Sequence, residues 1–405
     1  MKRLIVVSLA LTTALMMFGG MAPAQAAVTQ AVDDDGMASL TSCNAVTPTH
    51  ITIQAGVNAA AAGDTVKVCP GTYTENVTVN KALTLSGAKA GVNGTRVVNP
   101  ANESIVHPSD PNQPTFMLEV SAITVNGFLI EGNTNNAGIQ TRPTASGYQI
   151  LNNIVRDNVF GIYLHGDGAT TTLVRRNLLD NNNRPGAASG NGIYSDQGAL
   201  GITIQANSFR NHTNTGIVFA NAAVVQESII VQNNRSLNDN TFVALFDVQN
   251  ATVVANQTND TVDADDFGST IFVGGDSAGI VIQRNVLTNP GFSGIAVRDV
   301  LGTAGSTANV NVLGNTVTGA EGSGIDVTAE DFAAVSARNN TLRTNGIDGI
   351  FFGSSTVGNQ IRSNRASGNV NLDCEDDSTG SGTAGTANTW ANNDGVTDDP
   401  NGICP

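Results

Sequence analysis

A short pattern recurs along this chain at intervals close to the length of one solenoid turn. The pattern is an aliphatic residue, two variable residues and then asparagine, and Asn340 fits it with a degenerate Ala337. It occurs at 150–153, 174–177, 204–207, 231–234, 253–256, 282–285, 312–315 and 361–364. The asparagines are roughly 22 to 30 residues apart, which is typical of stacked coils with loops of varying size.

A second motif, Gly-Ile followed by alternating residues, keeps step with the first. It begins at Gly138, Gly161, Gly192, Gly216, Gly294, Gly324 and Gly349, while Val243 and Ile271 take the isoleucine position in two further coils. Alternation with a period of two indicates a strand with one buried face. We expect the repeated asparagine to occupy a tight turn in the left-handed conformation. Its amides should then form a ladder at the strand spacing of about 4.8 Å.

The first residues have the features of an export signal. Lys2 and Arg3 precede an apolar run over 4–18 and a small-residue cleavage site at 24–26. The run is too short to span a bilayer and no other segment comes close, so we expect no transmembrane segment. The sequence predicts a secreted protein, extracellular or held at the cell surface.

Four cysteines fall near the two ends of the chain. We expect two disulfides, Cys43 with Cys69 and Cys374 with Cys404, because export favours oxidation and local pairing costs the least loop-closure entropy. A zinc site is not expected, since no CxxC or paired histidine is present. The predicted division is a signal peptide over 1–26, an N-terminal extension over 27–50, a β-helix over 51–370 and a C-terminal cap over 371–405.

The charge balance argues against nucleic acid as a partner. The chain has a net charge of −15, which becomes −17 once Lys2 and Arg3 are removed with the signal. Such a balance does not favour binding to phosphates. We expect a monomer with no nucleic-acid partner.

A solenoid must cover its two apolar ends. Thr52 could cap a short helix whose Ile53, Val57 and Ala60 share one face over the first coil. The only tryptophan, Trp390, should cover the last coil, and the alternative is that it binds sugar.

On these motifs the chain resembles the right-handed parallel β-helix proteins of the pectate-lyase-like superfamily. The resemblance covers nearly all of the chain after the signal, including the opening segment 53–79. It implies an all-β, right-handed parallel β-helix with a helical N-terminal cap, and says little about function.

The resemblance also implies that the Gly-Ile strands form the sheet on which enzymes of this superfamily carry their active sites. If each isoleucine points inward, the residues one and three places later point outward. The first outer column is Gln140, Tyr163, Tyr194, Val218, Ala244, Phe272, Ala296, Asp326 and Phe351. The second is Arg142, His165, Asp196, Ala220, Phe246, Gly274, Arg298, Thr328 and Gly353.

The first coils of these columns bring an arginine, a histidine and a carboxylate into consecutive rungs. Arg142 could bind a uronic carboxylate or act as a base, His165 could move a proton, and Asp196 could orient the histidine or bind a cation. We expect Gln140, Tyr163, Tyr194 and Arg298 to contribute to ligand binding. The long loop over 181–191 should overhang this patch, and the later phenylalanines either stack on sugars or lie under loops.

Acidic clusters are a second candidate site. Asp263, Asp265 and Asp266 precede Ile271, and further acids flank Cys374. Calcium binds several such oxygens, so these clusters are either solvated loops or calcium sites, and calcium is the only cofactor that we consider.

The catalytic signatures of the enzyme families are missing. The Asp265-Asp266 pair is similar to the paired aspartates of polygalacturonases, but their Gly-His-Gly and Arg-x-Lys motifs are absent, as is the Asp-Pro-His-Asp signature of alginate epimerases. Two hypotheses therefore remain. The first is a noncatalytic β-helix that binds extracellular polysaccharide or serves as a surface scaffold or adhesin. The second is a divergent polysaccharide lyase or glycoside hydrolase acting on uronic-acid polysaccharide.

Overall fold

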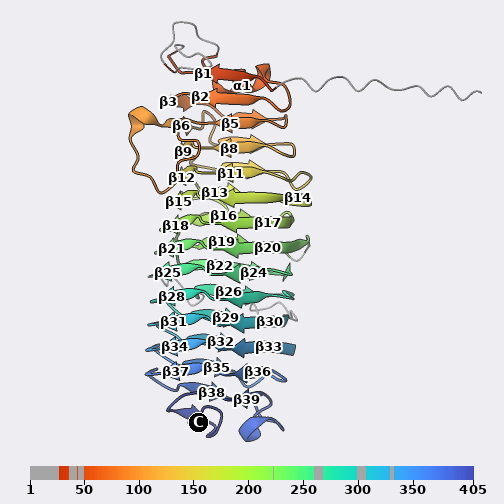
Figure 1. Ribbon diagram of the computed structural model, residues 1–405, viewed down its shortest axis with the longest axis vertical. Helices are drawn as coiled ribbons and strands as arrows, with labels where there is room; N and C mark the ends of the chain where they lie inside the picture. Colours follow the sequence, from red (N-terminus) through yellow and green to blue (C-terminus); the bar gives the residue numbers. More distant parts are fainter. Residues whose placement is uncertain are drawn as a thin grey trace, which may run out of the picture.

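The computed structural model describes residues 27–35, 43, 50–221, 223–259, 268–298, 307–328 and 333–405. Its strands stack into a long column in which each coil adds one strand to each of three parallel sheets (Figure 1). The predicted parallel β-helix is thereby confirmed. The predicted signal at 1–26 lies outside the described residues, and no helix among those described is long and apolar enough to cross a membrane.

The three sheets run along the length of the column. Sheet A consists of β1 (Thr29–Val32), β2 (Thr65–Val68), β5 (Thr84–Ser86), β8 (Thr124–Asn126), β11 (Gln149–Leu151), β14 (Gly166–Arg175), β17 (Ala199–Gln205), β20 (Gln226–Gln232), β24 (Thr252–Val254), β27 (Val281–Gln283), β30 (Ala308–Leu313), β33 (Ala333–Arg338), β36 (Gln360–Arg362) and β39 (Thr389–Ala391), and β23 (Val248–Gln249) pairs with β20. Sheet B consists of β3 (Gly71–Thr74), β6 (Ser104–His107), β9 (Leu129–Glu131), β12 (Ile154–Arg156), β15 (Leu178–Asp180), β18 (Ser208–Arg210), β21 (Arg235–Leu237), β25 (Gln257–Asn259), β28 (Val286–Thr288), β31 (Thr316–Thr318), β34 (Thr341–Arg343) and β37 (Arg365–Ser367). Sheet C consists of β4 (Val77–Val79), β7 (Phe116–Leu118), β10 (Ala137–Thr141), β13 (Phe160–Tyr163), β16 (Asn191–Ser195), β19 (Thr215–Phe219), β22 (Thr241–Phe246), β26 (Ile271–Gly274), β29 (Ile295–Val297), β32 (Ile325–Val327), β35 (Ile350–Phe352), β38 (Cys374–Asp376) and β40 (Asp398–Asp399).

The repeated asparagines form a buried ladder at the turn between sheets A and B. Each amide Nδ2 donates to the Oδ1 of the asparagine in the next coil, for example from Asn256 to Asn285 at 3.0 Å. The members are Asn153, Asn177, Asn207, Asn234, Asn256, Asn285, Asn315, Asn340, Asn364 and Asn393. The predicted ladder is confirmed, but the expectation that these asparagines are themselves left-handed is wrong. The residue before each one has the positive φ, as in Arg176 (55°) and Arg284 (51°), and this frees the asparagine side chain to point into the coil.

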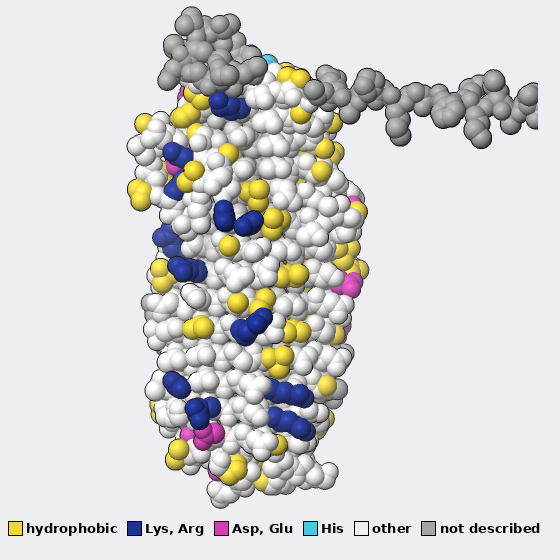
Figure 2. All heavy atoms as spheres, viewed as in Figure 1, with side chains coloured by type: hydrophobic (Ala, Val, Ile, Leu, Met, Phe, Trp, Pro, Cys, Tyr) yellow, Lys and Arg dark blue, Asp and Glu magenta, His cyan; other side chains and the backbone are white. Residues whose placement is uncertain are grey.

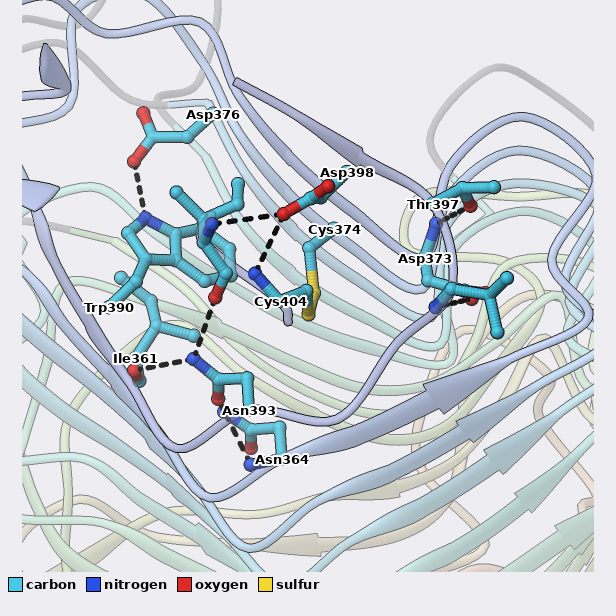
Figure 3. The surroundings of a disulfide bond; sticks show 12 residues. Ile361, Asn364, Asp373, Cys374, Asp376, Trp390, Asn393, Thr397, Asp398 and Cys404 are labelled. Carbon is cyan, nitrogen blue, oxygen red and sulfur yellow. Dashed lines mark hydrogen bonds between the residues drawn. A yellow bond between two sulfur atoms is a disulfide. The ribbon is translucent and has the colours of Figure 1, made fainter. Parts of the chain in front are cut away.

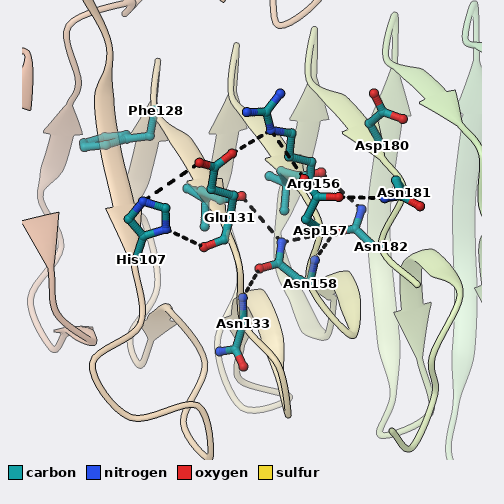
Figure 4. A network of polar contacts seen from close by, with 12 residues as sticks. His107, Phe128, Glu131, Asn133, Arg156, Asp157, Asn158, Asp180, Asn181 and Asn182 are labelled. Atoms are coloured by element: carbon teal, nitrogen blue, oxygen red, sulfur yellow. Dashed lines mark hydrogen bonds and ion pairs between the residues drawn. The ribbon is translucent and has the colours of Figure 1, made fainter. Parts of the chain in front are cut away.

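A second, less regular polar ladder lies at the turn between sheets B and C. The amide Nδ2 of Asn158 donates to Oδ1 of Asn182 at 3.1 Å, and the same series continues to the buried hydrogen bond between His212 Nδ1 and Asp239 Oδ1 at 2.7 Å. Beside it, on the outer face of sheet B, Glu131 forms an ion pair with Arg156 of the next strand and also contacts His107 of the preceding one (Figure 4). Such cross-strand pairs of opposite charge stabilise the stacking of coils.

The N-terminal end is closed by the helix α1 (Ile53–Ala59). The Thr52 side chain accepts a hydrogen bond from the Ala55 N–H, and Ile53, Val57 and Ala60 are buried, which confirms the predicted cap. The predicted disulfide between Cys43 and Cys69 is present. Strand β1, which falls within the predicted extension, pairs with β2 and so extends sheet A under the helix.

The C-terminal end is closed by residues after β37, including the short 3-10 helix η2 (Thr383–Gly385); the other 3-10 helix, η1 (Pro100–Asn102), lies near the opposite end of the column. Trp390 pairs in register with Ile361 and is only 4% exposed, while its Nε1 donates to Asp376 at 2.6 Å (Figure 3). The predicted role of Trp390 as the cover of the last coil is confirmed, and burial leaves no free ring face for a sugar. The disulfide between Cys374 and Cys404 is also present (Figure 3).

Candidate functional site

The outer face of sheet C carries the residues that the sequence places there. Gln140, Tyr163 and Tyr194 are register partners on β10, β13 and β16. The same column continues through Val218, Ala244, Phe272, Ala296, Asp326 and Phe351. Because each preceding aliphatic residue is fully buried, the predicted orientation of this column is confirmed.

Two tyrosines and an aspartate form a hydrogen-bonded group on this face, which we call the tyrosine site (Tyr163, Tyr194 and Asp196). The rings of Tyr163 and Tyr194 are stacked with centroids 5.7 Å apart and an interplanar angle of 29°. Their hydroxyls donate to the two oxygens of Asp196, at 2.6 Å from Tyr163 and 3.0 Å from Tyr194. Burial, followed by the hydrogen bond to Asp196, raises the pKa of Tyr194 to about 12 and raises that of Tyr163 as well. Both phenols therefore stay protonated as donors at neutral pH.

His165 lies beside the tyrosine site but is not open to solvent. Its ring centroid is 4.2 Å from that of Tyr163, and its Nε2 is 3.9 Å from Asp196 Oδ1. The residue is 0% exposed, so the expectation of a solvent-facing histidine is wrong: its neighbours Tyr163 and Asp196 cover it. Burial lowers its pKa, and its Nε2 has no hydrogen-bond partner. The ring is therefore a neutral imidazole with one free nitrogen close to Asp196.

Arg142 lies in the same column as His165, but no described contact joins the two side chains. Its guanidinium pairs with Glu119 of the preceding coil at 3.1 Å, and both side chains are about half exposed. The structure thus brings His165 and Asp196 together and gives Arg142 a different partner. Glu119 was not selected from the sequence, because its coil lacks the Gly-Ile motif that set the register.

The long loop over 181–191 lies against the tyrosine site, as expected. Ala188 packs in one apolar cluster with Phe160, Tyr163 and Tyr194. The ring of Phe160 meets that of Tyr163 edge to face at 5.4 Å and holds it in place. The amide of Gln197 donates to the Tyr163 hydroxyl at 2.5 Å. Sequence alone gave no signal for Gln197, because it lies past the strand, where alternation stops.

The middle of the outer column is apolar and mostly covered. Val218, Ala244, Phe272 and Ala296 are each at most 7% exposed, and Phe246 packs on them. Of the two expected roles of the phenylalanines, stacking on sugars is therefore not open to Phe272, because its side chain is buried.

Arg298, expected to bind ligand, is an ion-pair partner of Asp326 from the next coil. Its guanidinium also lies over the ring of Phe292, 4.9 Å from the centroid. Asp326 is 5% exposed and also accepts a hydrogen bond from Ser293. In this arrangement Arg298 is engaged within the protein.

The described residues contain no group of three or more His, Cys, Asp or Glu side chains arranged to hold a metal ion. Near Cys374, the carboxylates serve the cap instead: Asp373 accepts hydrogen bonds from Asn369 and Val396, and Asp376 binds Trp390. The expected calcium ligands Asp263, Asp265 and Asp266 lie outside the described residues.

Comparisons with known proteins agree with this architecture. No protein-family model matches the chain, and a search of curated proteins finds no match either. Among solved structures, the catalytic unit of a thermostable GH87 alpha-1,3-glucanase from Streptomyces thermodiastaticus strain HF3-3 has a TM-score of 0.55 and 15% identity, over 85% of this chain and 66% of that one. A PL6 family polysaccharide lyase from Pseudopedobacter saltans has a TM-score of 0.51 and 14% identity, over 87% of this chain and 88% of that one. At these identities the likeness shows the fold alone, and the chain shares the parallel β-helix fold of these two proteins.

Proposed function

We propose that this protein is an exported β-helix that binds polysaccharide on the outer face of sheet C, at the tyrosine site. The observation that carries the proposal is the stacked pair Tyr163 and Tyr194 with both hydroxyls directed at Asp196. Aromatic rings supply an apolar surface for the faces of sugar rings, and the nearby oxygens and amides supply hydrogen bonds to sugar hydroxyls.

The arrangement is pre-organised, which favours binding. Asp196 fixes the two hydroxyls, Phe160 supports the Tyr163 ring, and the half-buried Gln140 continues the column by one rung. Side chains held in one geometry lose little entropy when a ligand arrives. Two of the solved structures of similar fold are a glucanase and a polysaccharide lyase, which supports a polysaccharide as the ligand of this chain.

The test is a binding assay with soluble neutral polysaccharides, which carry no carboxylates for the charged surfaces of the protein. We expect the Tyr163→Ala/Tyr194→Ala double variant to bind at least about tenfold more weakly than the wild type, since about 1 to 3 kcal/mol is typical for one buried aromatic contact. Phe351→Ala is the matched control, because it removes a partly buried ring from the far end of the same column. Equal binding by the tyrosine variant and the wild type would refute the proposal, as would an equal loss in the control.

A second candidate function is catalysis, as a divergent lyase or hydrolase that uses Arg142, His165 and Asp196. It is favoured by one observation, the unpartnered Nε2 of a neutral His165 that is 3.9 Å from Asp196. A neutral imidazole can accept a proton at neutral pH. Binding is the stronger proposal because His165 is fully buried, so substrate could reach it only after Tyr163 or Asp196 moved.

The two candidates are separated by the products. Incubation with polysaccharides, with and without calcium, should give neither ultraviolet absorbance nor new reducing ends if the protein only binds. Turnover that is lost in an Arg142→Ala/His165→Ala/Asp196→Ala variant of unchanged fold would support catalysis instead.

Calcium binding at Asp263, Asp265 and Asp266 stays a prediction, for which calcium-dependent turnover or stability is the test. Export of the protein also stays a prediction, and detection of the processed chain outside the cell would test it.

A further inference from the structure

Arginines gather along the corner between sheets A and B, on a different face from the tyrosine site. Each lies within two residues of an asparagine of the buried ladder, which fixes where its backbone sits. We call the set the arginine stripe: Arg175, Arg176, Arg235, Arg284, Arg338, Arg362 and Arg365. All are exposed except Arg175, which is half-buried. Figure 2 shows Lys and Arg side chains along the length of this face and few Asp or Glu side chains.

The separation of charge at this corner is unusual for an acidic chain. The sequence has 34 acidic and 19 basic residues. Yet no acid occupies the two positions before or the one position after any ladder asparagine from Asn153 to Asn364. The first acid at such a position is Asp394, next to Asn393, and it pairs with Arg365. Among the described residues no ion pair involves the other six arginines of the stripe. Their charges are therefore available to a partner.

The stripe has a regular spacing along the column. Arginines occur on the coil that contains β14, then on those that contain β20, β27 and β33, which are every second coil. With about 4.8 Å between neighbouring strands, the charges recur about every 10 Å. Arg338 and Arg362 are register partners on adjacent strands and add a closer pair at the C-terminal end.

The row of sheet A between Arg175 and Arg338 carries only neutral side chains, which are three glutamines together with Val254 and Leu313. Gln205 and Gln232 follow Arg175 in the same row of sheet A, and Gln283 lies further along it. All three amides are partly exposed. In the described strands, no aromatic side chain occupies this row. The corner therefore offers guanidinium groups at a regular interval, with amides and two aliphatic side chains between them.

We infer that the arginine stripe binds a linear acidic polysaccharide, with uronic-acid carboxylates on the arginines and sugar hydroxyls on the amides. The guanidinium group pairs with a carboxylate through two parallel hydrogen bonds, and regular spacing suits a polymer with a regular repeat. A single-stranded nucleic acid fits less well, because its binding sites combine positive grooves with aromatic side chains on which bases stack. The inference is independent of the tyrosine site, which lies on sheet C.

The test uses the whole protein and a polyuronate, with binding measured at low and high salt. The variant is Arg176→Asn/Arg284→Asn. Both residues have positive φ, and asparagine already occupies the equivalent position at Asn152, Asn233 and Asn339, so the fold should be retained. The control Arg184→Gln/Arg210→Gln removes the same charge outside the stripe.

We expect wild-type binding that weakens as salt rises and is at least about tenfold weaker in the stripe variant. The control and the Tyr163→Ala/Tyr194→Ala variant should keep most of this binding. The inference would be overturned by no binding of polyuronate at low salt, or by an equal loss in the control. Equal or tighter binding of polyphosphate or single-stranded DNA would also overturn it. A loss confined to the tyrosine variant would place polyuronate at the tyrosine site instead.

Discussion

Removing one asparagine from the middle of the ladder should weaken the whole column. Asn256 is 0% exposed, and its side chain makes four hydrogen bonds. Its Oδ1 accepts from the backbone N–H and the side-chain amide of Asn234, and its Nδ2 donates to the Val231 carbonyl and to Asn285. Asn256→Ala leaves the Asn234 N–H and the Val231 carbonyl buried without these partners.

The magnitude follows from the number of bonds. A typical intramolecular hydrogen bond contributes about 1 kcal/mol net, and an unsatisfied buried group costs about 1 to 3 kcal/mol. We therefore expect Asn256→Ala to lower the free energy of unfolding by about 4 kcal/mol. Gln257→Ala, at the exposed neighbouring position, should change it by less than about 0.5 kcal/mol.

Urea denaturation followed by circular dichroism measures both variants against the wild type. A loss below about 1 kcal/mol for Asn256→Ala would refute the view that the ladder holds the coils in register. So would an equal loss in Gln257→Ala, because that side chain takes no part in the ladder.

Three further predictions concern titrating groups and the C-terminal cap. Burial, followed by the nearby Asp348, raises the pKa of Glu375 to about 7, so its stabilising contribution is present below pH 4.5 and lost as pH rises through 7. Glu375→Gln should therefore flatten the pH dependence of the free energy of unfolding and stabilise the protein at pH 8 by up to about 1 kcal/mol. An unchanged pH profile would contradict this. Burial lowers the pKa of His165, so its contribution to stability is present above pH 6.5 and lost as pH falls below that value. Titration of the ring followed by nuclear magnetic resonance should give a midpoint below 6.5. A higher midpoint would show that the ring is not buried as described. Cys374→Ser/Cys404→Ser opens a loop with a sequence separation of 30 and should cost about 3 kcal/mol of cap stability in urea, whereas no change would mean that the disulfide does not constrain the cap.

The fold could be predicted because short sequence motifs recur along the chain. The isoleucines after each glycine set the register of sheet C, and the buried asparagines set the corner between sheets A and B, so both features follow from local spacing. Only the conformation of the ladder turn was assigned to the wrong residue. A left-handed residue at the position before the asparagine is visible only in the backbone, since Arg176 and Ala206 give no common sequence signal.

The candidate site was harder to predict, because it depends on contacts between coils. Alternation put His165 on the outer face, but the packing of Tyr163 and Asp196 over it could not be seen from spacing. Similarly, the partner of Arg142 is Glu119, which stands on a coil without the diagnostic motif. The direction of a side chain follows from the periodicity of the sequence, whereas its burial depends on the side chains of the adjacent coils.

The most direct test of the account is hydroxyl-radical footprinting of the protein with and without a neutral polysaccharide that it binds. The account predicts that the ligand protects Tyr163 and Tyr194 from oxidation, while Phe351 on the same column changes little. Protection elsewhere with none at the two tyrosines would contradict the proposal that the tyrosine site is the binding surface.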